Sequence, residues 1–280
     1  DPGMAALGAK LFSSTLISQD GKVACSSCHL GEHGLAHAVP VSKIPHRPVT
    51  TTNSTTLYNV GLLYKLTWSG RFDTLEAHID ALIESPKIMG TSWTSIAERL
   101  AAVPGWTQQF EAVFAGGLGA NNVRASLLAY ERSLVTPDSA FDRWLNGDQA
   151  AISSDERAGY ALFKAYGCVS CHQGVLVGGN MFQRFGVMRD YSPGADSGTP
   201  DRSRYSVTRR HEDRQVYRVP SLRNVALTAP YFHDGSAPDL ETAVRVMAEY
   251  QLGRTLEDGD SRLIVAFLKS LTGTLHGKPL

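Results

Sequence analysis

Long apolar runs and an excess of one charge are both missing from this sequence of 280 residues. No stretch of about 18 apolar residues occurs, so the sequence predicts no helix that spans a bilayer. The 27 lysines and arginines balance the 27 aspartates and glutamates, which gives a formal net charge of zero. Nucleic acids and anionic membranes attract basic surfaces, so neither is expected as the main partner. The length suffices for two domains of ordinary size.

Cysteine is scarce, and its placement is the most informative feature. All four cysteines lie in two Cys-x-x-Cys pairs, each followed directly by histidine: Cys25-Ser26-Ser27-Cys28-His29 and Cys168-Val169-Ser170-Cys171-His172. A zinc site would place its two pairs about 15–20 residues apart, whereas Cys28 and Cys168 lie in different halves of the chain. A thioredoxin-like dithiol does not call for an adjacent histidine. Covalent c-type haem explains every element, with His29 and His172 as proximal iron ligands.

The two haem motifs also predict where the protein is located. Covalent haem of this kind is attached outside the cytoplasm, so we expect a periplasmic protein. The sequence begins with Asp1-Pro2 and not with methionine. This start indicates a processed chain, and a removed signal peptide would explain it.

Apolar residues spaced three and four apart predict a mainly α fold. The predicted helices cover residues 75–84, 95–103, 123–134, 157–166, 240–247 and 263–271. Capping-box patterns at Ser95-x-x-Glu98 and Ser153-x-x-Glu156 predict two helix starts, and Asp239 predicts a third. Gly273 is expected to stop the last helix.

The haem motif is itself a weak internal repeat, because an apolar helical segment precedes each copy. The turn signal at 146–148 lies between the copies. The chain is therefore predicted to form two cytochrome-c-like domains, residues 1–148 and 149–280, with one haem in each.

Several blocks of sequence resemble the bacterial di-haem cytochrome c peroxidase/MauG superfamily. They are Leu-Gly-Ala-Lys-Leu-Phe at 7–12, Trp-Ser-Gly-Arg at 68–71, Tyr-Glu-Arg-Ser-Leu at 130–134, Phe-Asp-Arg at 141–143 and Val-Pro-Ser-Leu-Arg-Asn-Val-Ala-Leu-Thr-Ala-Pro-Tyr-Phe-His-Asp-Gly at 219–235. In the second block the superfamily usually has Trp-Asp-Gly-Arg. The resemblance runs nearly end to end and keeps its register with both haem motifs.

This resemblance implies a division of labour between the haems. The N-terminal haem meets hydrogen peroxide, the C-terminal haem shares the oxidising equivalents, and Trp68 lies between them. A calcium ion between the domains is also implied, bound by the Asn53 side chain and by carbonyls at Thr228 and Pro230. Ligation by oxygen alone suits calcium. The arginines of 202–214 include a candidate partner for a haem propionate, with a solvated loop as the alternative.

The remaining iron faces have candidates of unequal quality. The resemblance implies Met247 as the sixth ligand of the C-terminal haem, and the alternative is a core methionine on a helix face. A His/Met pair raises a haem's reduction potential. MauG carries tyrosine at this position, and Tyr250 is one turn further on. His46 is the loosely matched distal histidine of the N-terminal haem, and His33 and His37 compete with it.

One departure from the superfamily concerns proton transfer. Its members usually have Pro-x-Glu-Met-Gly where this sequence has Pro-Lys-Ile-Met-Gly, so Ile88 replaces the distal acid–base glutamate. Isoleucine cannot move a proton between the peroxide oxygens. Glu84 and His78 are the candidate replacements, because both belong to the helix that the superfamily places over the first haem. The alternatives are a solvated helix end for Glu84 and a polar helix face for His78.

The leading functional prediction is an enzyme that uses hydrogen peroxide to form a high-valent two-haem state and oxidises a protein partner. The missing glutamate and the compact chain favour a MauG-like reaction on a partner's Trp or Tyr, as in methanobactin-associated di-haem enzymes. Met247 favours a cytochrome c peroxidase that takes electrons from a small redox protein. A pure electron-transfer di-haem cytochrome is the third hypothesis, and Ile88 favours it.

Overall fold

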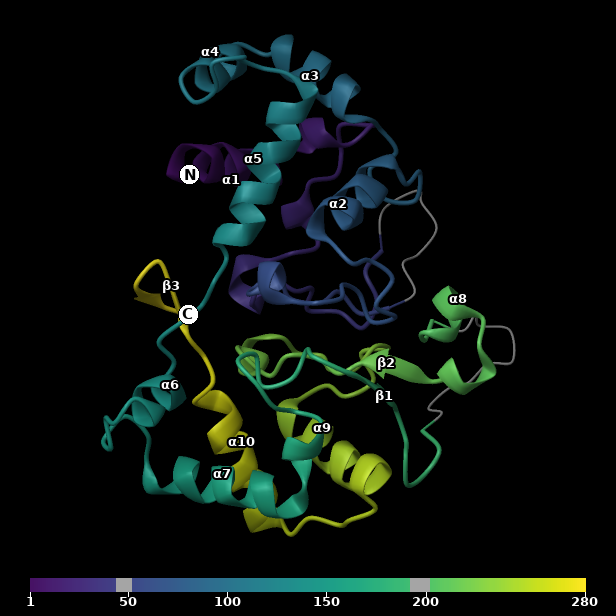
Figure 1. Ribbon diagram of the computed structural model, residues 1–280, viewed down its shortest axis with the longest axis vertical. Coiled ribbons are helices and arrows are strands. Elements are labelled where there is room, and N and C mark those ends of the chain that lie inside the picture. Colours follow the sequence, from purple (N-terminus) through teal and green to yellow (C-terminus); the bar gives the residue numbers. More distant parts are fainter. Residues whose placement is uncertain (44–51, 192–201) are drawn as a thin grey trace.

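A computed structural model describes residues 1–43, 52–191 and 202–280, and these residues are mainly helical, as predicted (Figure 1). The helices are α1 (Pro2–Phe12), α2 (Leu75–Glu84), α3 (Trp93–Ala101), α4 (Trp106–Glu111), α5 (Ala120–Ser133), α6 (Ala140–Leu145), α7 (Ser154–Tyr166), α8 (Tyr205–Thr208), α9 (Leu240–Val246) with a π-helical turn (Met247–Gln251), and α10 (Asp258–Lys269). Antiparallel strands pair as β1 (Phe182–Arg184) with β2 (Val216–Arg218) and as β3 (Thr274–Leu275) with β4 (Lys278–Pro279).

Side-chain caps mark the starts of several helices. At the start of α7, the Glu156 N–H donates to the Ser153 hydroxyl at 3.2 Å and the Ser153 N–H donates to the Glu156 carboxylate at 2.6 Å, which confirms that capping box. Asp239 caps α9 as predicted. The capping box at Ser95 is wrong, because Ser92 caps α3 and accepts a hydrogen bond from the Ser95 N–H at 3.2 Å.

Buried apolar side chains form two clusters. One draws its fully buried members from residues 7–134 and the other from residues 141–271. Figure 1 shows the corresponding halves one above the other, with the β1–β2 pair at the level where they meet. The C-terminal residues Leu275 and Leu280 nevertheless pack against the first cluster. The division at residue 148 therefore stays a prediction.

The same helix contact occurs once in each half. Gly8 of α1 lies against α5, where an added Cβ would stand 2.0 Å from the Ser126 carbonyl oxygen. Gly159 of α7 lies against α10, where an added Cβ would stand 1.9 Å from the Leu263 carbonyl oxygen. Glycine permits this close approach because it has no Cβ.

Aromatic rings extend this contact toward each haem motif. Four residues after the glycine, Phe12 contacts Tyr130 with ring centroids 5.1 Å apart, and Phe163 contacts Phe267 at 5.2 Å. Each phenylalanine ring also lies 6.4 Å from the histidine of its own motif. Each of α1 and α7 therefore lies beside its own Cys-x-x-Cys-His segment.

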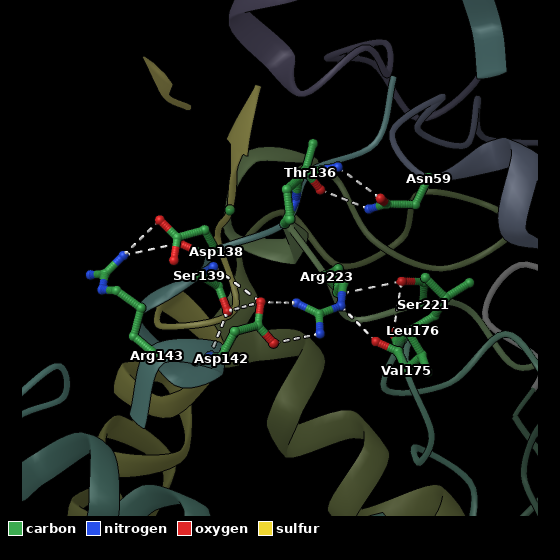
Figure 2. Close-up of polar contacts among 12 residues, drawn as sticks. Asn59, Thr136, Asp138, Ser139, Asp142, Arg143, Val175, Leu176, Ser221 and Arg223 are labelled. Carbon is green, nitrogen blue, oxygen red and sulfur yellow. Dashed lines mark hydrogen bonds and ion pairs between the residues drawn. The ribbon is translucent and has the colours of Figure 1, made fainter. Parts of the chain in front are cut away.

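A polar network ties the segment after α5 to both halves (Figure 2). The Thr136 N–H donates to Asn59 Oδ1 at 2.9 Å, and Asn59 Nδ2 donates to the Thr136 hydroxyl at 2.8 Å. The Arg223 guanidinium binds both oxygens of Asp142 at 2.8 and 2.7 Å. Such two-pronged pairs constrain orientation as well as distance.

The glycine contacts generate a stability prediction. Gly159→Ala should lower the free energy of unfolding by about 1–3 kcal/mol, because the added methyl group overpacks the contact with α10. Gly259→Ala, on α10 itself, is the matched control, since nothing lies within 4 Å of its added Cβ. Removing a helical glycine should stabilise by about 0.5–1 kcal/mol there. Urea unfolding measures both, and equal effects of the two substitutions would refute the close contact.

Candidate haem sites

Two cavities of about 230 Å³ each open between the elements, and each contains one Cys-x-x-Cys-His motif. The N-terminal cavity is lined by the first motif and by apolar side chains of α2 and α5. The C-terminal cavity is lined by the second motif and by apolar side chains of α9 and α10. Both are mainly apolar concave sites, as cofactor sites usually are.

The first motif holds its histidine in a form that can ligate a metal. His29 Nδ1 lies 2.8 Å from the Leu35 carbonyl oxygen, so the ring donates from this nitrogen and leaves Nε2 as an acceptor. Burial lowers the pKa of His29, although the hydrogen bond to Leu35 opposes the effect. The imidazole is therefore neutral, as a metal ligand must be.

The second motif surrounds its histidine with backbone on one side. Burial lowers the pKa of His172 to about 4. Its Nδ1 makes no hydrogen bond of normal geometry within the described residues, yet the backbone of Val177 and Pro220 lies close enough to oppose the effect of burial. Gly178 has φ +122°, and an added Cβ there would lie 3.1 Å from His172 Nδ1. Only glycine fits at position 178, because any side chain would approach the His172 ring and the backbone conformation is unfavourable for other residues.

One thiol of each motif is deeply buried, and burial favours its protonated form. Burial raises the pKa of Cys25, and raises that of Cys168 to about 11. Redox-active dithiols instead lower the pKa of a thiol. Each cavity thus offers two thiols and a neutral imidazole on a mainly apolar wall, and this set of groups fits a haem.

Trp68 stands where the two cavities meet. Its side chain lines both of them, and its indole N–H donates to the Asn53 carbonyl oxygen at 3.0 Å. The Trp68 ring also lies 6.4 Å from the ring of His233, which lines the C-terminal cavity. The structure therefore places Trp68 in the interval between the two motifs.

The two proton-transfer candidates lie in different environments. His78, on α2, lines the N-terminal cavity together with Ile88. Burial lowers the pKa of His78 to about 4, and His29 adds to the effect. Glu84, at the end of the same helix, is exposed and is not among the residues that line the cavity. The structure brings only His78 to the first haem motif.

Comparison with known proteins agrees with this architecture. The family model described as di-haem cytochrome c peroxidase matches residues 2–150. The chain is 38% identical to cytochrome c551 peroxidase of Nitrosomonas europaea, over 96% of this chain and 80% of that protein. The chain belongs to the di-haem cytochrome c peroxidase family. It is therefore an oxidoreductase of the peroxidase/MauG type.

Members of both branches of this family are among its relatives. The chain is 32% identical to the methylamine utilization protein MauG of Methylorubrum extorquens, over 96% of this chain and 78% of that protein. Its fold superposes with a TM-score of 0.84 on the crystal structure of a MauG-like protein associated with microbial copper homeostasis. That match has 25% sequence identity and covers 98% of this chain and 90% of the other.

The sixth-ligand position that the resemblance implies lies at the second cavity, and its ligation of iron stays a prediction. Met247 begins the π-helical turn after α9 and lines the C-terminal cavity with His172. π-Helical turns occur frequently at functional sites. Tyr250, one turn later, is described by the structure but does not line that cavity.

The residues matched to the family's calcium site all line the C-terminal cavity: Asn53, Thr228 and Pro230. Asn53 Nδ2 points to the carbonyl oxygens of Val39 and Pro40, at 3.2 and 3.3 Å, so its Oδ1 takes no part in those bonds. Calcium at this place stays a prediction. Within the described ranges, no group of three or more His, Cys, Asp or Glu residues could hold a metal ion.

The distal histidine has no counterpart that the structure places. His46 lies outside the described residues. His33 and His37 are described and line neither cavity, and His37 Nδ1 instead lies 2.7 Å from the Ser42 hydroxyl.

None of the described helices is long and apolar enough to cross a membrane.

Glu131 is a buried acid that the sequence analysis did not predict as a site residue, although it belongs to the Tyr-Glu-Arg-Ser-Leu block at 130–134. It lies on the apolar face of α5 at a spacing of four from Leu127 and lines the N-terminal cavity with it. Burial raises the pKa of Glu131 to about 8, so the carboxyl is protonated at neutral pH. The sequence does contain a signal for this buried acid, because Glu131 is an acidic residue at a position of the helix where the apolar spacing predicts burial.

The raised pKa of Glu131 predicts how stability depends on pH. Between pH 4.5 and pH 8 the folded protein keeps this proton and the unfolded chain loses it, so the stabilisation is lost as the pH rises. Glu131→Gln should therefore gain stability relative to the parent over this window, by at most about 1.4 kcal/mol per pH unit. Urea unfolding at several pH values tests it. A gain that does not grow with pH would contradict the assignment.

Proposed function

We propose that this protein carries two covalent c-type haems and uses hydrogen peroxide to oxidise a protein partner. The single observation that supports this most strongly is Trp68, because one side chain lines both haem-motif cavities. When bound, each haem supplies an iron that exchanges electrons. Cys25, Cys28 and His29 would hold one haem, and Cys168, Cys171 and His172 the other. Trp68 is the aromatic bridge for charge between them.

Reduction of one peroxide to two waters takes two electrons and two protons, so the N-terminal cavity needs a group that moves protons. His78 is neutral at neutral pH and can accept a proton from the entering peroxide and return it. Ile88 and its apolar neighbours limit water at the same place. Glu131, protonated and on the same cavity, is available as a proton donor.

The proton role of His78 is testable by substitution. His78→Ala should slow the reaction of the diferric protein with peroxide by at least about tenfold, because general acid–base assistance is typically worth about 10²–10⁴. Glu84→Gln is the matched control on the same helix and should react at the parent rate, since Glu84 is exposed. Stopped-flow absorbance measures both. A parent rate in His78→Ala removes His78 from proton transfer.

The electron source divides two candidate functions. Ile88, in place of the family's acid, and the structural likeness to a MauG-like protein associated with microbial copper homeostasis favour oxidation of a Trp or Tyr side chain in a partner. Met247 on the C-terminal cavity favours a peroxidase that draws electrons from a small cytochrome or cupredoxin, because a thioether ligand raises the potential of its haem. We place either partner in the periplasm, and we propose calcium at Asn53, Thr228 and Pro230.

Two assays separate these candidates. Peroxide-dependent oxidation of a reduced small cytochrome or cupredoxin supports the peroxidase. New oxygen or a crosslink on a Trp or Tyr of a co-purified periplasmic protein, found by mass spectrometry, supports the MauG-like reaction. A diferric protein whose spectrum does not respond to peroxide is a pure electron-transfer cytochrome.

Trp68→Phe tests the bridge itself. The substitution largely keeps the aromatic volume, so it should cost less than about 1.5 kcal/mol of stability. Both haems should stay attached with unchanged spectra, while peroxide-driven oxidation of the partner slows. Parallel measurements of haem content, urea unfolding and turnover distinguish the outcomes. Unchanged turnover would exclude Trp68 from the electron path, and a collapse of stability would identify it as a core residue only.

A further inference from the structure

Arg218 is a buried cation on the wall that the two cavities share. It lies on β2, is 3% exposed and lines both cavities, as Trp68 does. Its backbone N–H donates to the Trp68 carbonyl at 2.8 Å, and its Nε donates to the Thr67 carbonyl at 3.2 Å. Its Nη1 is buried and has no hydrogen-bond partner in the part of the chain that the structure describes.

No carboxylate in either wall compensates this charge. Of the residues that the structure describes, no Asp or Glu lines the C-terminal cavity, and only Glu131 lines the N-terminal one. Glu131 is protonated at neutral pH, as shown above. Burial lowers the pKa of Arg218 to about 10, which still leaves the guanidinium charged. A buried charge without a partner is strongly unfavourable, so this position calls for an anion.

Two other arginines near the cavities, Arg184 and Arg204, have their own partners. Arg184 lines the C-terminal cavity, but its side chain is 50% exposed and pairs with Asp190 at 2.7 Å. Arg204 stacks on Phe182 at 4.0 Å and lies 4.0 Å from Asp213. None of the arginines 202, 204, 209, 210 and 214 is among the described residues that line a cavity. The expectation that this loop supplies a propionate partner is therefore not supported by their placement.

We propose that Arg218 is the shared counter-ion of the two haems, binding a propionate carboxylate of each through one guanidinium. The proposal rests on the proposed function, since it requires a haem in both cavities. Propionates are the only carboxylates that a haem brings, and the planar guanidinium presents several N–H donors that match carboxylate geometry. Arg218 is the only arginine or lysine among the described residues that line both cavities.

A shared counter-ion has an electrostatic consequence for both irons. A fixed positive charge disfavours the ferric state, which carries one more positive charge than the ferrous state. The low-dielectric, buried position makes this effect larger than it would be at the surface. Arg218 therefore raises both reduction potentials together. The same residue is hydrogen-bonded to Trp68 through its backbone N–H.

Potentiometry on the holoprotein tests this pairing. In Arg218→Gln, both midpoint potentials should fall, so that the ferric-to-ferrous ratio at a fixed potential rises at least about tenfold, equivalent to 59 mV for one electron. Arg218→Lys keeps the positive charge, so both midpoint potentials should fall less in this variant than in Arg218→Gln. Arg204→Gln, the neighbouring control, should leave both potentials at the parent values. Unmoved potentials in Arg218→Gln, or movement of only one, would overturn the shared counter-ion.

Two further measurements keep the test decisive. Haem content per chain is determined first, because fewer than two covalent haems refutes the proposed function independently of Arg218. If Arg218→Gln does not accumulate, a crystal structure of the parent holoprotein decides the matter. It should show a carboxylate oxygen of each haem within about 3.2 Å of the Arg218 guanidinium. A guanidinium that contacts no propionate, or the propionates of one haem only, overturns the proposal.

Discussion

The hydrogen bond from the Arg218 N–H to the Trp68 carbonyl joins a loop of the first half to a strand of the second. Together with the Nε bond to Thr67, it fixes two large side chains on one wall. Because that wall belongs to both cavities, an aromatic ring and a cation reach both haem motifs at once. In the proposed function, charge would pass between the two sites at this junction.

Each half contains the same helix contact. A glycine lets α1 approach α5 closely and another lets α7 approach α10, and a phenylalanine one turn later lies 6.4 Å from the motif histidine. The repeated contact leaves the opposite wall of each cavity free to differ. His78 and Ile88 line the first cavity, and Met247 lines the second. The same helix contact therefore supports two sites whose remaining wall residues differ chemically.

Prediction from sequence succeeded where the signal was local. The helix at 75–84 and the capping box at Ser153 depend on side chains within a few residues of each other, and the structure has both. The capping box at Ser95 failed because Ser92 offers the same chemistry one turn earlier. Glu84 and His78 looked equivalent on one helix, yet only His78 faces the cavity, since the packing of α2 decides which side is buried.

The sequence by itself determined the haem motifs, the helical character and the family, because each depends on residue types at short spacings or on long matched blocks. Only the tertiary structure decided which charged groups are buried. Glu131 and Arg218 come from elements far apart in the chain, and their pKa shifts arise from neighbours that folding brings around them. Burial is a property of the whole packing arrangement, so no short pattern could have distinguished Arg218 from the exposed Arg209, Arg210 and Arg214 that precede it.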